Sequence, residues 1–219
     1  EENRLGTGGG VRFASRHFAE GKSIIAMNGD VVSGMELREL VETHQKTGAW
    51  ATLAVFRNAS FPDALHKVSF DADGSVVSLD GITSSTNESA VVGRSIYTGT
   101  LVMSPDFISA LPTDREACLK EDGFWPGLKS GKKLQVFETS AYWSDIGTPV
   151  RYLETHMESL QNRTCVPVGN YTEIKTGVWV HATAQVHPGV KLGETIVVGP
   201  DAVVEKGVTL ERNVVLGEA

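Results

Sequence analysis

The sequence contains few cysteines, no long apolar run and no excess of positive charge. Cys118 and Cys165 are the only cysteines among 219 residues, and their spacing is not that of a metal site. We therefore expect two free thiols in a reducing cytoplasm. Because no stretch of about 18 apolar residues occurs, we expect no membrane span. The first ten residues, EENRLGTGGG, are too acidic and polar for a signal peptide.

The balance of charge and hydrophobicity limits the partners of the chain. The formal net charge is -7, which predicts no general affinity for nucleic acid or for an anionic membrane. A phosphate compound would therefore have to be held by local groups. Hydrophobic residues make up 41% of the chain and charged residues 21%, as in ordinary soluble globular proteins.

The first half of the sequence has the pattern of an α/β protein. Residues 23–27, SIIAM, form a short apolar run that predicts a fully buried strand. A helix should follow, because Ser33 and Glu36 have the spacing of a capping box and Gly48 stands where a helix would stop. Residues 51–56, ATLAVF, predict a second buried strand, so the segment predicts a βαβ unit. The apolar face of the helix should contain Leu37, Leu40, Val41 and His44.

Further elements extend this α/β sheet. A hairpin is predicted over residues 68–79 with its turn at Asp73-Gly74, and further strands over 98–103 and 134–138. Near the start, the glycine-rich segment 6–10 predicts a loop that leads into a helix. The apolar side of that helix should carry Val11, Ala14 and Phe18.

A different pattern begins near residue 178. Aliphatic residues recur every six positions, which is typical of a parallel β-helix built from hexapeptide repeats. We expect little more than two coils, with an open end that a partner chain or further coils should cover. One series comprises Val180, Val186, Leu192, Val198, Val204, Leu210 and Leu216, and the other comprises Val178, Ala184, Val190, Ile196, Ala202, Val208 and Val214.

Two aspartates follow structural signals that would place them at a ligand site. Asp30 comes just after the strand at 23–27, and ligands of open α/β sheets bind beyond the carboxyl ends of the strands. Asp145 lies in the loop before a predicted helix at 149–160, for which Thr148 is a good N-cap and Pro149 a good first residue. Magnesium usually takes one or two carboxylates and completes its shell with water and phosphates. Asp30 and Asp145 are therefore candidate Mg²⁺ ligands, although each alone is equally typical of a turn or an exposed loop.

The order of these motifs resembles that of the sugar nucleotidyltransferases. LGTGGG, then NGD at a strand end, then WSDIGTP with YL following, then hexapeptide repeats, is similar to the mannose-1-phosphate guanylyltransferase-like branch. The resemblance covers nearly the whole chain. It implies a Rossmann-like α/β sheet followed by a left-handed parallel β-helix. It also implies that a sugar 1-phosphate attacks a nucleoside triphosphate with Mg²⁺, releasing pyrophosphate.

The resemblance also implies roles for particular residues. Asp30 and Asp145 match the catalytic, metal-binding aspartates of the family. The remaining matches are nucleotide-binding positions at Gly6, Thr7, Gly8 and Asn28 and sugar-binding positions at Gly99 and Trp143. The expected domains are a nucleotidyltransferase-like portion at 1–150, a connecting helix and linker at 151–174, and a β-helix at 175–219. Homo-oligomerisation through the β-helix is expected.

Two departures from the family pattern affect these expectations. The GGxGTRL loop and the later Pro-Lys are absent, so we expect the chain to begin well inside the nucleotide-binding half and to turn over substrate poorly alone. The family's Glu-Lys-Pro is also absent, and Arg94 or Lys67 could supply the lost charge.

Two other functions remain open. A non-catalytic regulatory or scaffold subunit would keep the fold and the oligomerising tail without the triphosphate loop. A hexapeptide-repeat acyltransferase could use His181 or His187, which open successive hexads, as a general base. Trp125 and Trp143 could stack on a base or sugar or could serve as packing residues.

Overall fold

The computed structural model describes residues 4–57, 67–84 and 90–217. The chain divides into two compact units, Glu1–Val31 with Met35–Trp143, and Val32–Gly34 with Ser144–Ala219. This division falls seven residues before the boundary we predicted at residue 150 and places the predicted connecting helix inside the second unit. No helix in the described part of the chain is long and apolar enough to cross a membrane.

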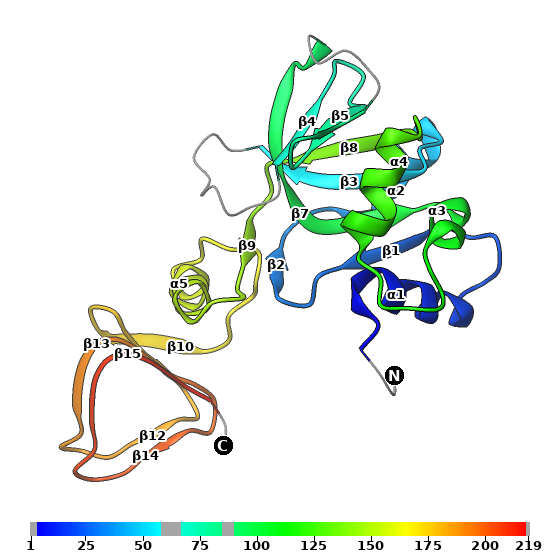
Figure 1. The fold of residues 1–219 in the computed structure, drawn as a ribbon. Coiled ribbons are helices and arrows are strands. Elements are labelled where there is room, and N and C mark those ends of the chain that lie inside the picture. Colours follow the sequence, from blue (N-terminus) through cyan, green and yellow to red (C-terminus); the bar gives the residue numbers. More distant parts are fainter. Residues whose placement is uncertain (1–3, 58–66, 85–89, 218–219) are drawn as a thin grey trace. The chain divides into compact units, whose positions relative to one another are not determined.

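The first unit contains a mixed seven-stranded sheet (Figure 1). Its strand order is β6-β5-β4-β7-β3-β8, and β1 pairs with β7 off this path. The predicted hairpin at 68–79 and the predicted strands at 98–103 and 134–138 are confirmed. The strands are β1 (Ile24–Met27), β3 (Ala51–Phe56), β4 (Lys67–Phe70), β5 (Val76–Leu79), β6 (Ile82–Thr83), β7 (Gly93–Met103) and β8 (Leu134–Thr139).

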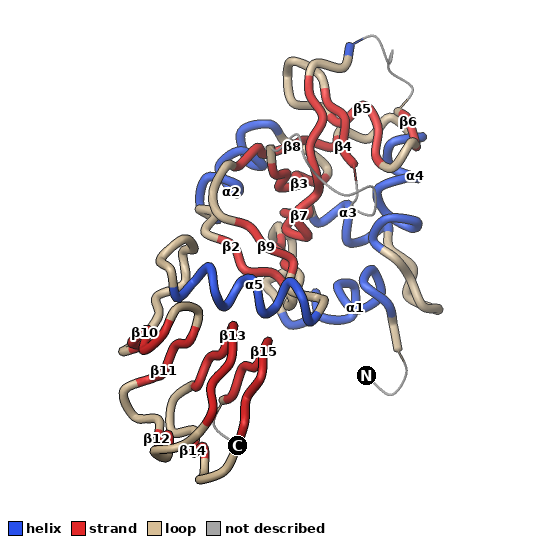
Figure 2. Tube along the Cα trace, turned by 90° about the vertical axis from the view of Figure 1, so that its left-hand side faces the viewer, coloured by secondary structure: helices blue, strands red, loops and turns tan. Residues whose placement is uncertain are grey.

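Helices cover both faces of this sheet (Figure 2). On one face α2 (Leu37–Thr47) packs Leu40 against Ala54 and Val102 of the sheet. On the other, α3 (Pro105–Ala110), the π-helix η3 (Leu119–Phe124) and α4 (Trp125–Lys129) pack on the larger core around Leu53 and Leu101. The N-terminal α1 (Gly6–Ala14) and the 3₁₀ turn η1 (Ser15–His17) complete the unit.

The predicted strand–helix–strand unit is present, but its details differ from the expectation. Strands β1 and β3 each pair antiparallel with β7, on its two opposite edges. The two strands therefore run parallel to each other with β7 between them. The predicted stop at Gly48 is confirmed, since it adopts the left-handed conformation with φ of 59°. The capping box was wrong, because α2 begins at Leu37 and Ser33 lies in a strand.

Two further expectations for the N-terminal region were wrong. Strand β1 is not fully buried, since Ile25 and Met27 are exposed and, among the described residues, β1 pairs with β7 alone. The glycines at 6–10 do not form a loop ahead of a helix, since they are the first residues of α1 itself. Phe18 lies beyond this helix and is exposed.

The second unit begins with a helix and most of a small strand pair, whose first residues, Val31 and Trp143, belong to the first unit. Strand β2 (Val31–Ser33) pairs with β9 (Trp143–Asp145). Helix α5 (Pro149–Leu160) follows, and the predicted N-cap is confirmed because the Thr148 side chain accepts a hydrogen bond of 3.2 Å from the Arg151 N–H. Six short strands complete the unit, and these are β10 (Tyr171–Lys175), β11 (Val178–His181), β12 (Gln185–Val186), β13 (Lys191–Val198), β14 (Val203–Val204) and β15 (Thr209–Leu216).

The C-terminal strands stack in parallel at an offset of 18 residues. Val178 of β11 pairs with Ile196 of β13, which pairs with Val214 of β15. Strands β12 and β14 repeat the same offset on another side of the stack (Figure 1). This arrangement is compatible with the predicted β-helix, in which three hexads would make one coil.

The hexad residues form the core of this stack. Val178, Ile196, Val198, Ala202 and Val204 are buried together. The other members of the two series pack against them, except Val208, which is exposed. The six-residue period therefore identified inward-facing positions correctly along most of the stack.

Val198→Asp should destabilise the second unit strongly. Val198 is fully buried, so the variant places an unpaired carboxylate among aliphatic side chains at a cost of several kcal/mol. The matched control is Val203→Asp in β14, where the side chain is 61% exposed. Thermal melting followed by circular dichroism should show a large loss for the first variant and little change for the second. Equal melting temperatures would contradict the assignment of Val198 to the core.

A buried histidine ties α2 to the sheet of the first unit. The Nδ1 atom of His44 lies 2.9 Å from Thr52 Oγ1 in β3, and its Nε2 lies 3.2 Å from Ser23 Oγ. Burial lowers the pKa of His44 below its usual value of 6.5, because the charged imidazolium is poorly solvated there. The folded protein therefore holds this histidine neutral more firmly than the unfolded chain does.

This pKa shift predicts an acid-dependent loss of stability. Below pH 6.5 the unfolded chain binds a proton at His44 before the folded protein does, so the stabilising contribution is complete above that pH and falls as the pH drops towards the lowered pKa. Urea denaturation between pH 5 and 8 should show a smaller pH dependence for His44→Gln than for the parent. His17→Gln, at an exposed site, is the control and should retain the parent's dependence. An unchanged slope in His44→Gln would contradict the argument.

Candidate functional site

The long strand β7 changes its partner on one edge at Gly99. Its C-terminal part pairs with β1, ending at Met27 opposite Thr100. Its N-terminal part pairs with β4, beginning at Lys67 opposite Ile96. The residues between these pairings therefore lie at a split in the sheet (Figure 1). Open α/β sheets usually bind their ligands beyond the carboxyl ends of their strands, and the carboxyl end of β1 lies at this split.

The other edge of β7 is irregular at the same point. Leu53 and Val55 of β3 face Leu101 and Tyr97 of β7, so two residues along β3 correspond to four along β7. This bulge interrupts the ladder, and Thr98 compensates by donating its hydroxyl proton to the Ala54 carbonyl at 2.9 Å. Bulges of this kind often lie next to active sites, because they redirect a side chain or end a pairing.

Three residues predicted as ligand contacts meet at this split. Gly99 has φ of +79°, and a Cβ atom there would lie 2.6 Å from Asn28 Nδ2. The Asn28 N–H donates to the Gly99 carbonyl at 3.0 Å. Trp143 belongs to the same unit and donates its indole N–H to the Thr98 carbonyl at 3.0 Å. The structure thus brings Asn28, Gly99 and Trp143 together, with the exposed side of Asn28 available to a ligand.

The two aspartates belong to different units. Asp30 is an exposed residue of the first unit, two positions after Asn28. Asp145 is half-buried at the end of β9 in the second unit, and its Oδ1 accepts the Gly147 N–H at 2.9 Å. Its neighbour Ser144 is fixed by Thr155 Oγ1 at 2.7 Å and by the Arg151 guanidinium at 2.8 Å. Among the described residues, no group of three or more His, Cys, Asp or Glu could hold a metal ion.

The glycine-rich segment uses several of its polar groups internally. The N–H groups of Gly8 and Gly9 donate to the Ala117 carbonyl at 2.8 and 3.3 Å. Thr7 Oγ1 accepts the Leu119 N–H at 3.0 Å, and a Cβ atom at Gly6 would lie only 2.5 Å from the Ala117 oxygen. The glycines therefore permit close packing of α1 against the segment before η3. A nucleotide contact at Gly6, Thr7 or Gly8 stays a prediction.

A polar pocket of about 550 Å³ was missed by the sequence reasoning. Arg57 directly follows strand β3, and Glu138 lies near the end of the neighbouring parallel strand β8. The two side chains form an ion pair through two hydrogen bonds of 2.7 and 2.9 Å. This pairing raises the pKa of Arg57 above its usual value. Arg94 lines the same pocket. Both residues lie at the carboxyl ends of predicted strands, which was the available signal. Because Arg57 and Glu138 are 81 positions apart, the sequence did not indicate that they pair.

The histidines proposed for an acyltransferase do not line the same pocket. His181 borders a pocket of about 370 Å³ beside α5, whereas His187 borders a separate one of about 680 Å³ on β12 and β14. Trp125 is half-buried against the core of the first unit, with the Lys120 ammonium 5.2 Å from its ring. This contact favours a packing role for Trp125.

Known proteins are similar to this chain in sequence and in fold. Residues 1–162 match the model of the family described as nucleotidyl transferase. A probable mannose-1-phosphate guanylyltransferase 2 of Oryza sativa subsp. japonica is 26% identical over 99% of this chain and 59% of its own length. A mannose-1-phosphate guanylyltransferase of Mycobacterium tuberculosis is 28% identical over 98% of this chain and 58% of its own length. The chain therefore spans less than two thirds of these relatives.

A solved structure supports the fold independently. HddC from Yersinia pseudotuberculosis, in a crystal structure complexed with GMP-PN, superimposes with a TM-score of 0.54 and 23% sequence identity. The match covers 70% of this chain and 62% of that one. The likeness extends the sequence match to the arrangement of the strands and helices.

Gly99→Ala should displace the Asn28 side chain. The added methyl group would overlap the Asn28 amide, and the positive φ makes any side chain at this position strained. The control is Gly131→Ala, which has φ of +74° but nothing within 4 Å of the new methyl group. Both variants should lose about 1–2 kcal/mol of stability, whereas only Gly99→Ala should shift the Asn28 side-chain amide signals in a ¹⁵N NMR spectrum. Unmoved Asn28 signals would show that the two residues are not in contact.

Proposed function

Because this chain belongs to the nucleotidyl transferase family, we propose that it is part of a sugar-1-phosphate guanylyltransferase that forms a nucleotide sugar and pyrophosphate. The observation that carries the proposal is the meeting of Asn28, Gly99 and Trp143 where β7 changes partners, with Asp30 two residues beyond Asn28. The names of the relatives support guanine as the base and mannose as the sugar to test first.

The residues at the split have distinct roles in this proposal. The exposed amide of Asn28 hydrogen-bonds the nucleotide, and Gly99 leaves room for that amide because it has no side chain. The Trp143 ring is held by its bond to the Thr98 carbonyl and offers an apolar face to the sugar. The rates of such displacements depend mainly on positioning and on neutralising charge, which these fixed groups would serve.

We assign Asp30 and Asp145 as ligands of Mg²⁺. Carboxylate oxygens are the ligands that magnesium prefers, and two of them leave room for water and substrate phosphates. Asp145 fits this role because only its Oδ1 accepts the Gly147 N–H, and Arg151 and Thr155 fix the preceding Ser144. The ion would neutralise charge on the triphosphate at the moment of displacement. The chain's own contribution at Asp145 is to orient its carboxylate through the Gly147 N–H.

The C-terminal stack has a proposed role in assembly. We propose that its coils form a left-handed parallel β-helix and that its open end meets another copy of the protein. The 18-residue offset between paired strands supports the β-helix. The predicted domain limits at 150 and 175 stay predictions.

The activity can be tested on protein expressed from the complete open reading frame. It would be offered a mixture of nucleoside triphosphates and sugar 1-phosphates with Mg²⁺, and products would be identified by mass spectrometry. Formation of a guanosine diphosphate sugar with release of pyrophosphate is expected. Complete absence of product with a correctly folded protein would favour the alternative of a non-catalytic subunit of the same fold.

Asp30→Asn and Asp145→Asn should lower turnover far more than stability. Each substitution removes a negative charge from the proposed metal site while conserving side-chain size, so the expected loss in kcat is at least about 100-fold. The matched control is Asp201→Asn, at an exposed turn with φ of 56° that asparagine tolerates equally well. Melting temperatures of all three should lie close to the parent. Normal turnover in both site variants would exclude these residues as metal ligands.

A further inference from the structure

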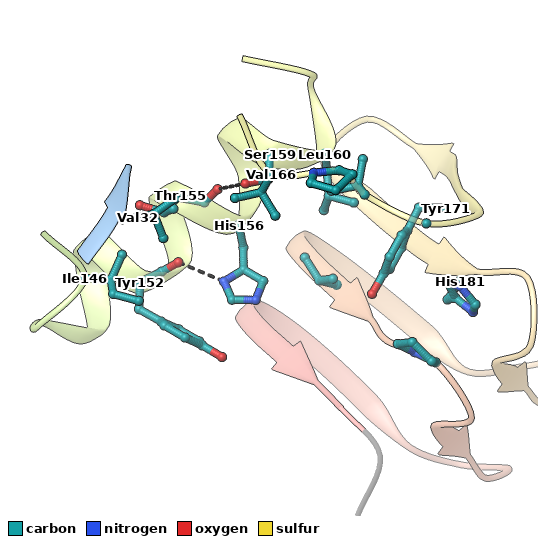
Figure 3. A pocket seen from close by; sticks show the side chains of 15 residues that line it. Val32, Ile146, Tyr152, Thr155, His156, Ser159, Leu160, Val166, Tyr171 and His181 are labelled. Atoms are coloured by element: carbon teal, nitrogen blue, oxygen red, sulfur yellow. Dashed lines mark hydrogen bonds between the residues drawn. The ribbon is translucent and has the colours of Figure 1, made fainter. Parts of the chain in front are cut away.

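A second pocket lies within the second unit, between α5 and strands β10, β11 and β13 (Figure 3). Its volume is about 370 Å³, at the small end of the range for small-molecule sites. Its walls are largely apolar and include Ile146, Leu160, Val166 and Val197. Tyr152 and His156 border it from α5, and Tyr171 and His181 border it from β10 and β11 (Figure 3).

The hydrogen bonds of the two histidines define a donor and an acceptor at this pocket. The Nδ1 atom of His156 lies 2.9 Å from the Tyr152 carbonyl, which can only accept, so Nδ1 donates and Nε2 of the neutral ring is an acceptor. His181 has the opposite arrangement, because its Nδ1 accepts the Thr183 N–H at 3.2 Å. Its Nε2 therefore carries the proton and lies beside Gly169, another lining residue.

The pocket contains aromatic rings but no full charge. None of the described residues that line it is a lysine, arginine, aspartate or glutamate. A phosphate group entering this space would lose its hydration without gaining a cationic partner, which is unfavourable. Flat rings suit the aromatic borders, where Tyr152 packs on His156 with centroids 4.4 Å apart and Tyr171 on His181 at 4.9 Å.

We propose that this pocket is a regulatory site for an uncharged, planar heterocycle with a hydrogen-bond donor and an acceptor on its rim, of the size of a purine base. The donor of the ligand would face His156 Nε2, and its acceptor would face His181 Nε2. The regulatory part of the proposal rests on the proposed function, whereas the binding part does not.

The pocket is connected to the proposed metal ligand through α5. Thr155 and Ile146 both line it, and the Thr155 hydroxyl lies 2.7 Å from Ser144 Oγ. Ser144 directly precedes Asp145 in β9, and Ile146 directly follows it. A ligand that binds one arrangement of α5 and β9 more tightly than another would shift the position of Asp145 accordingly.

Calorimetry with adenosine and inosine tests the binding step directly. The protein from the complete open reading frame should bind one of these nucleosides saturably, with one site per chain. Val166→Trp should abolish the binding because the new ring fills the pocket, whereas Val203→Trp, at an exposed position of β14 outside the pocket, should not. His156→Phe keeps the ring but removes the acceptor, so affinity should fall about 5- to 10-fold.

Several outcomes would overturn the site. One is the absence of saturable binding in the folded parent, and another is equal binding by Val166→Trp. A third is that, at the site which Val166→Trp abolishes, adenosine 5′-monophosphate binds more tightly than adenosine. Concentration-dependent self-association that only Val166→Trp abolishes would assign the pocket to a protein contact instead. Melting temperatures of the variants establish that each is folded.

The coupling to Asp145 has its own readout. In the ¹⁵N spectrum of the parent, saturating nucleoside should shift the Gly147 amide signal, since that N–H donates to Asp145 Oδ1. An unshifted signal despite binding would overturn the regulatory assignment. Neither measurement requires turnover, so absence of transferase activity would refute the proposed function without affecting the binding result.

Discussion

Strand β7 must serve two different neighbours on one edge, and Gly99 makes this possible. The strand pairs with β1 as far as Thr100 and with β4 from Ile96, and the backbone between them adopts a positive φ at Gly99. Three backbone carbonyls at the irregularity, those of Ala54, Thr98 and Gly99, accept hydrogen bonds. The Thr98 hydroxyl satisfies Ala54, while the Thr98 and Gly99 carbonyls accept from Trp143 and Asn28. Two of the residues that stabilise the split, Asn28 and Trp143, are therefore also residues that we assign to ligand binding.

Local signals in the sequence predicted the regular parts of the fold. The hairpin at Asp73-Gly74, the cap at Thr148 and the stop at Gly48 each depend on residues within one turn of the element they define. The six-residue period likewise identified the core of the C-terminal stack, because each repeat has the same local environment. Such signals need no knowledge of distant residues.

The failures have a common physical reason, which is competition from distant segments. Ser33 had a capping pattern, but it belongs to a strand pair formed with residues more than 100 positions away. The glycines at 6–10 suggested an open loop, yet they form a helix whose close packing on Ala117 only glycine permits. The ion pair between Arg57 and Glu138 had no local signal at all. Asn28, Gly99 and Trp143 meet in the structure, and their roles in binding stay predictions, as does the shared role of Asp30 and Asp145, which belong to two separate units.

The balance of charge makes a metal ion central to the proposed chemistry. The chain has a net charge of -7, and both proposed catalytic side chains are carboxylates, so a bound triphosphate would meet repulsion unless a cation intervened. The ion pair of Arg57 with Glu138 also reduces the positive charge that the first unit offers to a phosphate. The account therefore requires Asp30 and Asp145 to act on one ion, although they come from different parts of the chain.

Replacement of Mg²⁺ by paramagnetic Mn²⁺ tests this requirement most directly. The protein from the complete open reading frame, with guanosine triphosphate present, would be titrated with Mn²⁺ and followed by ¹⁵N NMR, with Mg²⁺ as the diamagnetic reference. The account predicts that one equivalent broadens both the Asn28 side-chain amide, two residues from Asp30, and the Gly147 amide, which is bonded to Asp145. Broadening of only one of these signals, or of neither, would contradict a metal site shared by the two aspartates.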